Sequence, residues 1–125
     1  MIHLDTSFLI RAGRRISPES ERLRVWLRRH ELVRISSIAW AEFLCGPVPP
    51  PAVDDAAELL GEPEPLTGVD ATVAAHLFNV SGRRRGSLTD CLIAAVAINA
   101  DAELATTNLA DFRKFTPHGL TIAVR

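Results

Sequence analysis

The chain has 125 residues, of which 47% are hydrophobic and 23% are charged, and its formal net charge is -1. This composition is that of a globular protein and excludes a disordered or fibrous chain. The length suits one domain, residues 1–125, that buries a core without disulfides or a structural metal. The near-neutral charge does not by itself indicate a nucleic-acid partner.

Short apolar runs alternate with cap and turn residues, which predicts strands alternating with helices along the chain. The expected strands cover residues 2–4, 32–35, 103–106 and 120–124, the last one at a sheet edge. The expected helices run from Phe8 to near Gly13, from Ser17-Pro18 to about His30, and over 38–45, 52–60, 69–80, 87–100 and, as a short turn, 109–115. This order favours a three-layer α/β/α domain with a central, mostly parallel sheet covered by helices on both faces.

The two cysteines give no sign of a metal site. Cys45 and Cys91 lie far apart and lack the spacing and the nearby histidine that a zinc site needs. Both lie in apolar runs and are expected to be small buried hydrophobic residues. The chain has no apolar run of transmembrane length and no basic, cleavable leader. We therefore expect a reduced, cytoplasmic protein without a membrane partner.

The segment over residues 87–100 is almost unbroken in its apolar character, and Asp90 is its single charge. A helix that is apolar on every side is buried all round. Ser87 and Asp90 fit the Ser-x-x-acid pattern in which side chains bind the first free amides of a helix. On this stretch alone, a helix-start carboxylate is the simpler interpretation of Asp90.

Other acids occupy comparable positions. In parallel α/β sheets, ligands bind beyond the carboxyl ends of the strands. Asp5 follows the first expected strand, and Asn108 and Asp111 follow the third. Glu42 is the only charge in an apolar helix, where an unpaired carboxylate is costly if it is buried.

Each acid also has an ordinary explanation: Asp5 and Asp111 could cap helices, and Glu42 could lie on a narrow exposed face. Taken together with Asp90, they favour a shared site whose charges repel one another when it is empty. Carboxylates without cysteine or converging histidines select Mg2+ or Mn2+. Such ions support phosphodiester hydrolysis by polarising the phosphate and activating water.

Polar and basic residues flank these acids. The side chains that could orient the carboxylates or bind phosphate oxygens are Thr6, Ser7, Thr89, Thr106 and Asn108, with ordinary caps and turns as an equal alternative. Arg83, Arg84 and Arg85 lie in a glycine-flanked loop shortly before Asp90. They suit contacts to the phosphate backbone of RNA, and a solvated surface loop is the alternative.

Four motifs occur in a fixed order along the chain. They are Asp5-Thr-Ser-Phe-Leu-Ile10, Ser37-x-x-x-Ala41-Glu42-Phe-Leu-x-Gly46, Asp90-x-x-Ile93-Ala-Ala95 and Thr106-x-Asn108-x-x-Asp111-Phe112. In order and spacing they resemble the motifs of PIN-domain ribonucleases, and the VapC-type toxins of bacterial toxin–antitoxin pairs are the most similar subgroup.

The resemblance implies a metal-dependent endoribonuclease of RNA that uses Mg2+ or Mn2+. It implies that Asp5, Glu42 and Asp90 are catalytic acids of the metal site and that Asp111 is the fourth, with Asn108 as the alternative. It also implies a homodimer, and a small VapB-like antitoxin whose C-terminal tail enters the active-site groove. The alternative function is a catalytically silent RNA- or protein-binding module of the same fold.

Overall fold

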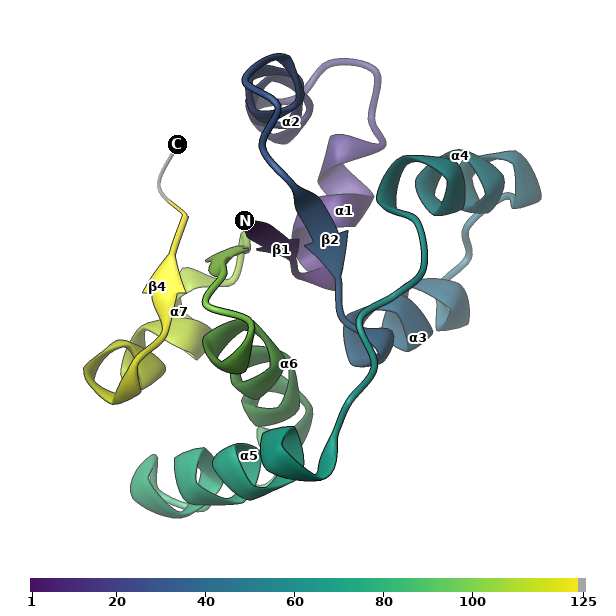
Figure 1. The fold of residues 1–125 in the computed structure, drawn as a ribbon. Coiled ribbons are helices and arrows are strands. Elements are labelled where there is room, and N and C mark those ends of the chain that lie inside the picture. The colour runs from purple at the N-terminus through teal and green to yellow at the C-terminus, as the bar shows by residue number, and fades with distance from the viewer. Residues whose placement is uncertain (124–125) are drawn as a thin grey trace.

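A computed structural model describes residues 1–123 of the chain. Four strands form one entirely parallel sheet in the order β2-β1-β3-β4 (Figure 1). The central pair is β1 (Ile2–Leu4) and β3 (Glu103–Ala105), with β2 (Val33–Ile35) beyond β1 and β4 (Thr121–Ile122) beyond β3. The predicted parallel sheet is confirmed, with the last strand at its edge. Val124, in the strand predicted over 120–124, lies outside the described residues.

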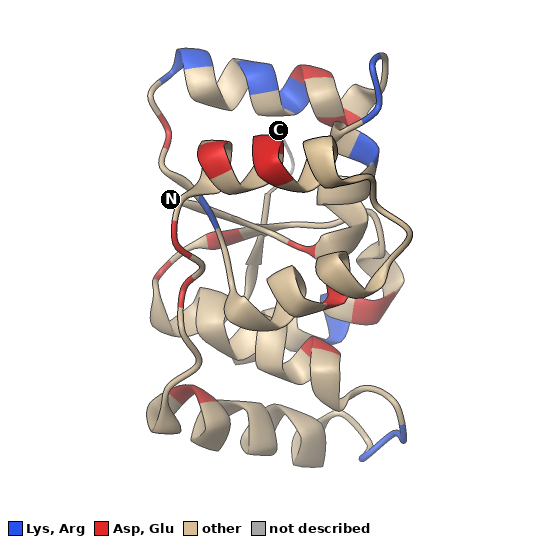
Figure 2. Ribbon diagram, turned by 90° about the vertical axis from the view of Figure 1, so that its right-hand side faces the viewer, with Lys and Arg blue, Asp and Glu red and all other residues tan. Residues whose placement is uncertain are grey.

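Helices lie on both sides of this sheet, as predicted. They are α1 (Thr6–Ala12), α2 (Pro18–Arg28), α3 (Ser37–Cys45), α4 (Pro50–Leu60), α5 (Gly68–Val80), α6 (Leu88–Asn99), α7 (Leu109–Phe112) and the 3-10 helix η1 (Arg113–His118). In Figures 1 and 2, α2 and α5 lie at opposite ends of the molecule, with the strands between them. The α/β class with a central sheet is therefore confirmed.

Two helices begin two residues earlier than the sequence predicts. α1 begins at Thr6 rather than Phe8, and the carbonyl oxygen of Asp5 accepts amide hydrogen bonds from Phe8 and Leu9, each 3.1 Å long. α4 begins at Pro50 rather than Ala52. A proline fits the first helical turn because its missing N–H would have no partner inside the helix there.

The core centres on α6. Cys91 and residues 93–97 are each at most 2% exposed, so the helix is buried on nearly all sides as predicted. Its first and last residues, Leu88 and Asn99, are exposed, Leu88 by 50%. α5 packs along α6, which also contacts β3 and α3. The helix that carries Asp90 in its first turn is therefore held by packing from several elements.

An arginine joins α1, α2 and the end of the sheet. The rings of Phe8 and Trp26 stack with their centroids 5.4 Å apart, and the guanidinium carbon of Arg22 lies 5.3 Å from each centroid. Arg22 also donates a hydrogen bond of 2.8 Å to the carbonyl oxygen of Ala123. The aromatic pair and the cation thus fix α1, which carries Asp5 at its start, against the sheet.

The central strand carries a buried histidine. His3 is 1% exposed, and neither of its ring nitrogens has a hydrogen-bond partner among residues 1–123. Arg34 is the paired residue on β2, and its guanidinium lies 3.2 Å from a carboxylate oxygen of Glu64. The sheet interior therefore contains an unsatisfied polar group, which is uncommon in native proteins.

The cysteines differ in their environments. Cys91 is buried, as predicted, but the prediction for Cys45 is wrong because its side chain is exposed at the end of α3. Both are free thiols. Within the described chain, none of the helices combines the length and the apolar character that a membrane span requires.

Candidate active site

The carboxyl ends of the central strands meet at one edge of the sheet. Leu4 pairs with both Ile35 and Ala105, so β1, β2 and β3 end level with one another. Asp5 and Thr106 are the residues that follow β1 and β3, and they therefore lie side by side. In Figure 2, acidic segments of several elements and the basic loop between α5 and α6 lie on the same, right-hand side of the molecule.

Asp5 is the most firmly held of the four acids. Its side chain is 4% exposed, and its Oδ2 atom accepts hydrogen bonds from the hydroxyls of Ser7 (2.7 Å) and Thr106 (2.8 Å). Each hydroxyl is positioned in turn by a backbone amide, Ser7 by that of Thr107 at 3.1 Å and Thr106 by that of Asn108 at 3.0 Å. Because both hydroxyls donate to Oδ2, they leave Oδ1 uncommitted.

Asp5 does not cap its helix. The side chain makes no capping hydrogen bond to α1, so the ordinary explanation offered for this acid is wrong. The carboxylate is instead turned toward the loop after β3, where Ser7 and Thr106 bind it.

Thr6 links the start of α1 to α3. Its hydroxyl lies 3.1 Å from Oε1 of Glu42 and 2.9 Å from the carbonyl oxygen of Ala39. Glu42 is exposed, so its charge carries no burial cost, as in the alternative that places it on an exposed face. Only Ala39 and Phe43 of α3 are buried, because this apolar helix turns much of its surface outward.

The pKa of Asp90 responds to the charges of the other three acids. It is half-buried in the first turn of α6, and its pKa is raised from 3.8 to about 6. Burial is the largest cause, followed by the negative charges of Asp5, Asp111 and Glu42, while Lys114 acts in the opposite direction. The charges of Asp5, Asp111 and Glu42 therefore all act on the carboxyl group of Asp90.

Asp111 lines the same cavity as Asp90, whereas Asn108 does not. Asp90 and Asp111 line the same cavity of about 230 Å³, together with Lys114. Asn108 is exposed, and it contributes its backbone amide to Thr106 rather than its side chain to the acids. Asp111 is thus the better-placed candidate for the fourth acid.

The start of α6 departs from the predicted capping pattern. Ser87 is the N-cap residue, but its hydroxyl donates a hydrogen bond of 2.7 Å to the carbonyl oxygen of Arg84 instead of accepting an amide. Thr89 is half-buried and makes no side-chain hydrogen bond within the described part of the chain. The structure therefore gives Thr89 no role in orienting a carboxylate.

The three arginines of the α5–α6 loop are not equivalent. Arg84 and Arg85 line the cavity that holds Asp90 and Asp111. Arg83 instead contacts the side chain of Asn79 and lies 5.7 Å from the Phe78 ring centroid. A basic residue that the sequence reasoning missed, Lys114, also lines the cavity, and its position three residues after Asp111 at helical spacing is the signal that could have found it.

The acidic residues suit a hard divalent cation in their chemistry but are not gathered into a finished site. Carboxylate oxygen donors match Mg2+ or Mn2+, and the one adjacent thiol, that of Cys91, is buried in the core. Among residues 1–123, however, no three His, Cys, Asp or Glu side chains come close enough to hold one ion. Asp5 is fixed, whereas Glu42 is exposed, so a cation would have to bring the other acids toward Asp5.

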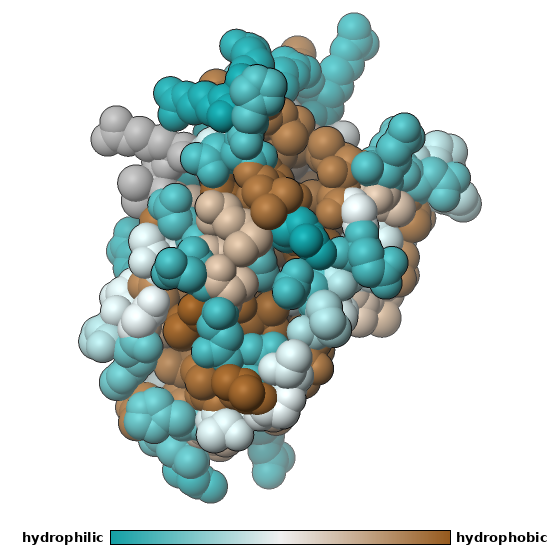
Figure 3. Space-filling view, in the orientation of Figure 1, coloured by the Kyte–Doolittle hydropathy of each residue, from teal (hydrophilic) through white to brown (hydrophobic). Residues whose placement is uncertain are grey.

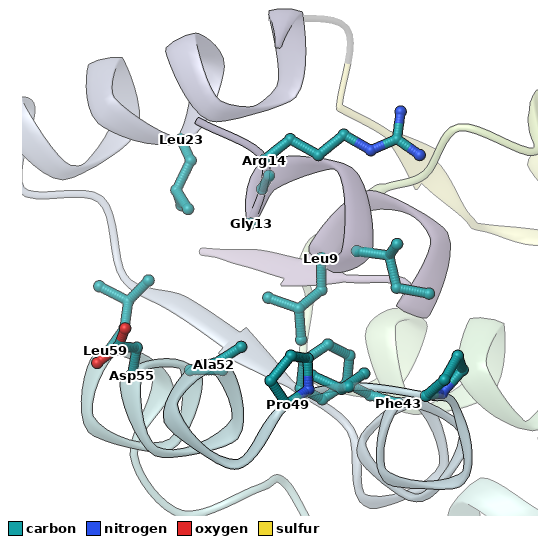
Figure 4. A pocket seen from close by; sticks show the side chains of 14 residues that line it. Leu9, Gly13, Arg14, Leu23, Phe43, Pro49, Ala52, Asp55 and Leu59 are labelled. Atoms are coloured by element: carbon teal, nitrogen blue, oxygen red, sulfur yellow. The ribbon is translucent and has the colours of Figure 1, made fainter. Parts of the chain in front are cut away.

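A second hollow lies beside this edge. It has a volume of about 410 Å³ and is lined mainly by apolar side chains from α1, α2, α3 and α4, among them Leu9, Leu23, Phe43 and Leu59 (Figure 4). Arg14 and Asp55 are the charged residues in its lining. The surface between α2 and α4 is correspondingly hydrophobic in Figure 3. Leu9 lies one helical turn after Thr6 and Phe43 directly follows Glu42, although none of the four acids lines the groove.

Comparisons with known proteins identify the family and agree with the fold. The family model described as PIN domain matches residues 2–116. The chain is similar in structure to VapBC2 from Rickettsia felis bound to a promoter DNA fragment, with a TM-score of 0.78, 22% identity and 98% of each chain covered. It is also similar to a toxin–antitoxin complex from Klebsiella pneumoniae, with a TM-score of 0.70, 25% identity and 90% of each chain covered. For VapC20 from Mycobacterium tuberculosis, a Sarcin-Ricin loop cleaving toxin, the TM-score is 0.68 at 20% identity, with 98% of each chain covered. No curated protein matches the chain by sequence.

Proposed function

The chain belongs to the PIN domain family, and from that membership we propose that it is a metal-dependent endoribonuclease and the toxin of a toxin–antitoxin pair. The observation that carries the proposal is the raised pKa of Asp90, which results in part from the charges of Asp5, Asp111 and Glu42. Negative charges that act on one carboxyl group are costly unless a cation or a proton compensates them. Acids near the carboxyl edge of a parallel sheet suit a catalytic metal site that a bound cation would complete.

Asp5, Glu42, Asp90 and Asp111 would hold Mg2+ or Mn2+. When bound, such a cation polarises the scissile phosphate and lowers the pKa of a water molecule that attacks it. Asp5 would offer Oδ1, because Ser7 and Thr106 already occupy Oδ2. These hydroxyls keep the carboxylate in one orientation, which spares the site the cost of ordering it when the ligand binds.

Thr6 and Asp90 supply two further parts of the arrangement. The Thr6 hydroxyl holds the otherwise exposed Glu42 at the start of α1, close to Asp5. Asp90, with a pKa of about 6, gives up its proton close to neutral pH when no cation is present. Cation binding would favour the ionised form, so metal affinity should increase with pH.

RNA cleavage tests this function directly. We expect the wild-type protein to cut RNA with Mg2+ or Mn2+ and to stop when EDTA is added. Asp5→Asn and Asp90→Asn should each lower the rate at least a hundredfold, because each removes a charge from the site while conserving its shape. Asp54→Asn, an equal charge change on the exposed surface of α4, is the matched control and should retain activity. Cleavage that survives in both site variants would refute the assignment.

A catalytically silent binding module remains the second candidate. It is favoured by the lack of a ready-made three-acid cation site among residues 1–123. A pure RNA binder, however, has no use for carboxylates where phosphates must lie. Binding of RNA without any cleavage, at every Mg2+ and Mn2+ concentration tested, would support this alternative.

The partner in the proposal is a small antitoxin that places an apolar helical segment in the groove between α1, α2, α3 and α4. Apolar grooves of this kind accept the hydrophobic face of an amphipathic helix. The similar Klebsiella pneumoniae structure is a toxin–antitoxin complex, which supports this class of partner. Because the groove adjoins Thr6 and Glu42, an extension of the bound segment could reach the acids and block RNA.

Co-purification with the product of the adjacent gene tests this partner. Leu59 lines the groove and is 42% exposed, so Leu59→Asp should weaken the complex at least tenfold by placing a charge in the contact. Leu27 is 38% exposed on α2 and does not line the groove. Leu27→Asp is therefore the control and should leave the complex intact. Equal affinity of both variants would contradict docking at this groove.

A homodimer belongs to the same proposal. Leu44 at the end of α3 and Leu88 at the start of α6 are 49% and 50% exposed, and these two helices contact each other. Exposed leucines on neighbouring helices provide apolar surface that a second copy could bury. Light scattering should give the mass of a dimer, and Leu44→Asp should shift it toward the monomer. A monomer at all protein concentrations would contradict the proposal.

A further inference from the structure

The cavity of about 230 Å³ beside the acids is lined by charged side chains of both signs. Asp90 and Asp111 are its acidic lining residues. Its basic lining residues are Arg84, Arg85 and Lys114, which come from two separate segments, the α5–α6 loop and η1. Three cations and two carboxylates thus share one small space.

The conformation of the α5–α6 loop places Arg84 and Arg85, but not Arg83, at this cavity. Arg83 has a left-handed φ of 54°, and its side chain contacts Asn79 and the Phe78 ring. Arg84 and Arg85 follow, and among residues 1–123 neither makes an ion pair or a side-chain hydrogen bond. Gly86 ends the loop with a φ of 87°, a conformation that side-chain-bearing residues seldom adopt. Two guanidinium groups are therefore left uncommitted at the cavity.

Lys114 comes from η1 and packs over a buried aromatic ring. It is half-buried, and its ammonium nitrogen lies 5.3 Å from the centroid of the Phe115 ring. Phe115 itself is fully buried, so it anchors the lysine stem. The charge of Lys114 is felt at Asp90, where it opposes the effect of the neighbouring acids. An ammonium group packed against a ring, next to two uncommitted guanidinium groups, is suited to a phosphate group.

We propose that this cavity is a phosphate subsite, in which Arg84, Arg85 and Lys114 bind the RNA phosphate next to the one that is cut. The inference rests on the proposed nuclease function and adds to it a specific place for the substrate backbone. Carboxylates alone would repel the RNA strand. The three basic residues that line the cavity offset that repulsion next to the acids.

The size and lining of the cavity argue for a phosphate rather than a base. Its volume of about 230 Å³ is below the range of about 300–1,000 Å³ that pockets for drug-sized ligands occupy. Its lining includes no aromatic ring, which a base would need for stacking. The subsite should therefore contribute equally to the binding of RNAs of different sequence.

Fluorescence anisotropy with two single-stranded RNA oligonucleotides of unrelated sequence, in EDTA, tests the subsite. Lys114→Gln and the double variant R84Q/R85Q should weaken binding of both oligonucleotides by the same factor. The slope of log affinity against log salt should fall by about 0.7 for each phosphate that a variant no longer neutralises. Lys114→Arg, which conserves the charge, should restore the slope. Thermal unfolding of each variant checks that the fold is intact.

Arg83→Gln is the matched control, since it removes the same charge from the same loop but outside the cavity. It should change the slope by much less than Lys114→Gln. Equal effects of these two variants would mean that the loop acts only through net charge, and the subsite would be wrong. A polyglutamate peptide that displaces RNA as well as an RNA competitor of equal charge would also overturn it.

The two proposals can fail separately. If the wild-type protein cuts RNA and Lys114→Gln binds it normally, the nuclease function stands and the subsite fails. If no condition gives cleavage but the predicted loss of binding in Lys114→Gln is observed, the subsite stands and the catalytic assignment fails.

Discussion

Thr106 donates a hydrogen bond of 2.8 Å to Oδ2 of Asp5, although 101 positions separate the two residues in the sequence. This bond exists because β1 and β3 are neighbours in the sheet and end at the same level. The hydroxyl that follows β3 thereby orients the carboxylate that follows β1. The orientation of Asp5 thus depends on the sheet as well as on its own segment, in which Ser7 is the other donor.

Thr106→Val should expose this dependence. The change conserves shape but removes one of the two hydroxyls that bind Oδ2, and leaves the buried carboxylate partly unsatisfied. We expect a loss of about 1–3 kcal/mol in the free energy of unfolding and a tenfold or greater loss of Mn2+ affinity. Urea unfolding and calorimetric titration measure these. Thr121→Val, on the exposed side of β4, is the control, and equal behaviour of the two variants would contradict the role of Thr106.

Asp90 should make the metal-free protein less stable as the pH rises. Its pKa is raised from 3.8 to about 6, so the folded state binds its proton more tightly than the unfolded state does. The stabilisation is fully present below about pH 3.8 and is lost as the pH rises through 6. After allowance for solvent screening, we expect about 1–2 kcal/mol.

Urea unfolding of the wild-type protein and of Asp90→Asn in EDTA, from pH 4 to 8, measures this effect as a difference. The variant should match the wild type near pH 4 and be more stable at pH 8. Adding Mg2+ should then stabilise the wild type alone, because the ligand binds the folded state. A difference that stays constant with pH would show that Asp90 does not titrate in this range.

His3 should give a pH dependence of opposite sign. Burial lowers its pKa below 6.5, helped by Arg34 and the N-terminal amine and opposed by Glu64 and Asp70. Its contribution to stability is present above pH 6.5 and is lost as the pH falls toward the lowered pKa. His3→Leu should remove this acid sensitivity and be as stable as the wild type at pH 7 or more so, because the buried nitrogens have no partners. A large destabilisation at pH 7 in urea unfolding would contradict this.

Arg22→Lys should destabilise the fold by about 1–2 kcal/mol. Lysine cannot both lie over the rings of Phe8 and Trp26 and donate to the carbonyl oxygen of Ala123 with a planar group. Arg24→Lys is the control, because Arg24 is 59% exposed and its ion pair within residues 1–123 is the surface pair with Glu21. It should change stability by less than about 0.5 kcal/mol. Similar melting of both variants would refute the structural role of Arg22.

The strand-end positions of the site were accessible from the sequence. Asp5 and Thr106 each follow a short apolar run, and a parallel sheet brings such positions to one edge. The buried helix over residues 87–100 was equally clear from its unbroken apolar character. The assignment of the four acids to a metal site remains a prediction.

Side-chain orientation was not accessible in the same way. Three consecutive arginines look alike in the sequence, yet Arg83 turns back onto α5 while Arg84 and Arg85 reach the cavity. Ser87 fits a capping pattern, but its hydroxyl donates a hydrogen bond to the carbonyl oxygen of Arg84 instead. Such choices depend on tertiary neighbours that compete with local preferences.

The pairing of Asp5 with Thr106 also sets a time at which the candidate site can be completed. At about 5–20 residues per second, a ribosome needs roughly 5–20 s to pass from Asp5 to Thr106. Until the later segment has been made, β1 lacks one of its two neighbours and Asp5 lacks one of its two hydroxyl donors. A nascent chain therefore carries an incomplete site during most of its synthesis, and under the proposed nuclease function this would delay attack on RNA near the ribosome that makes it.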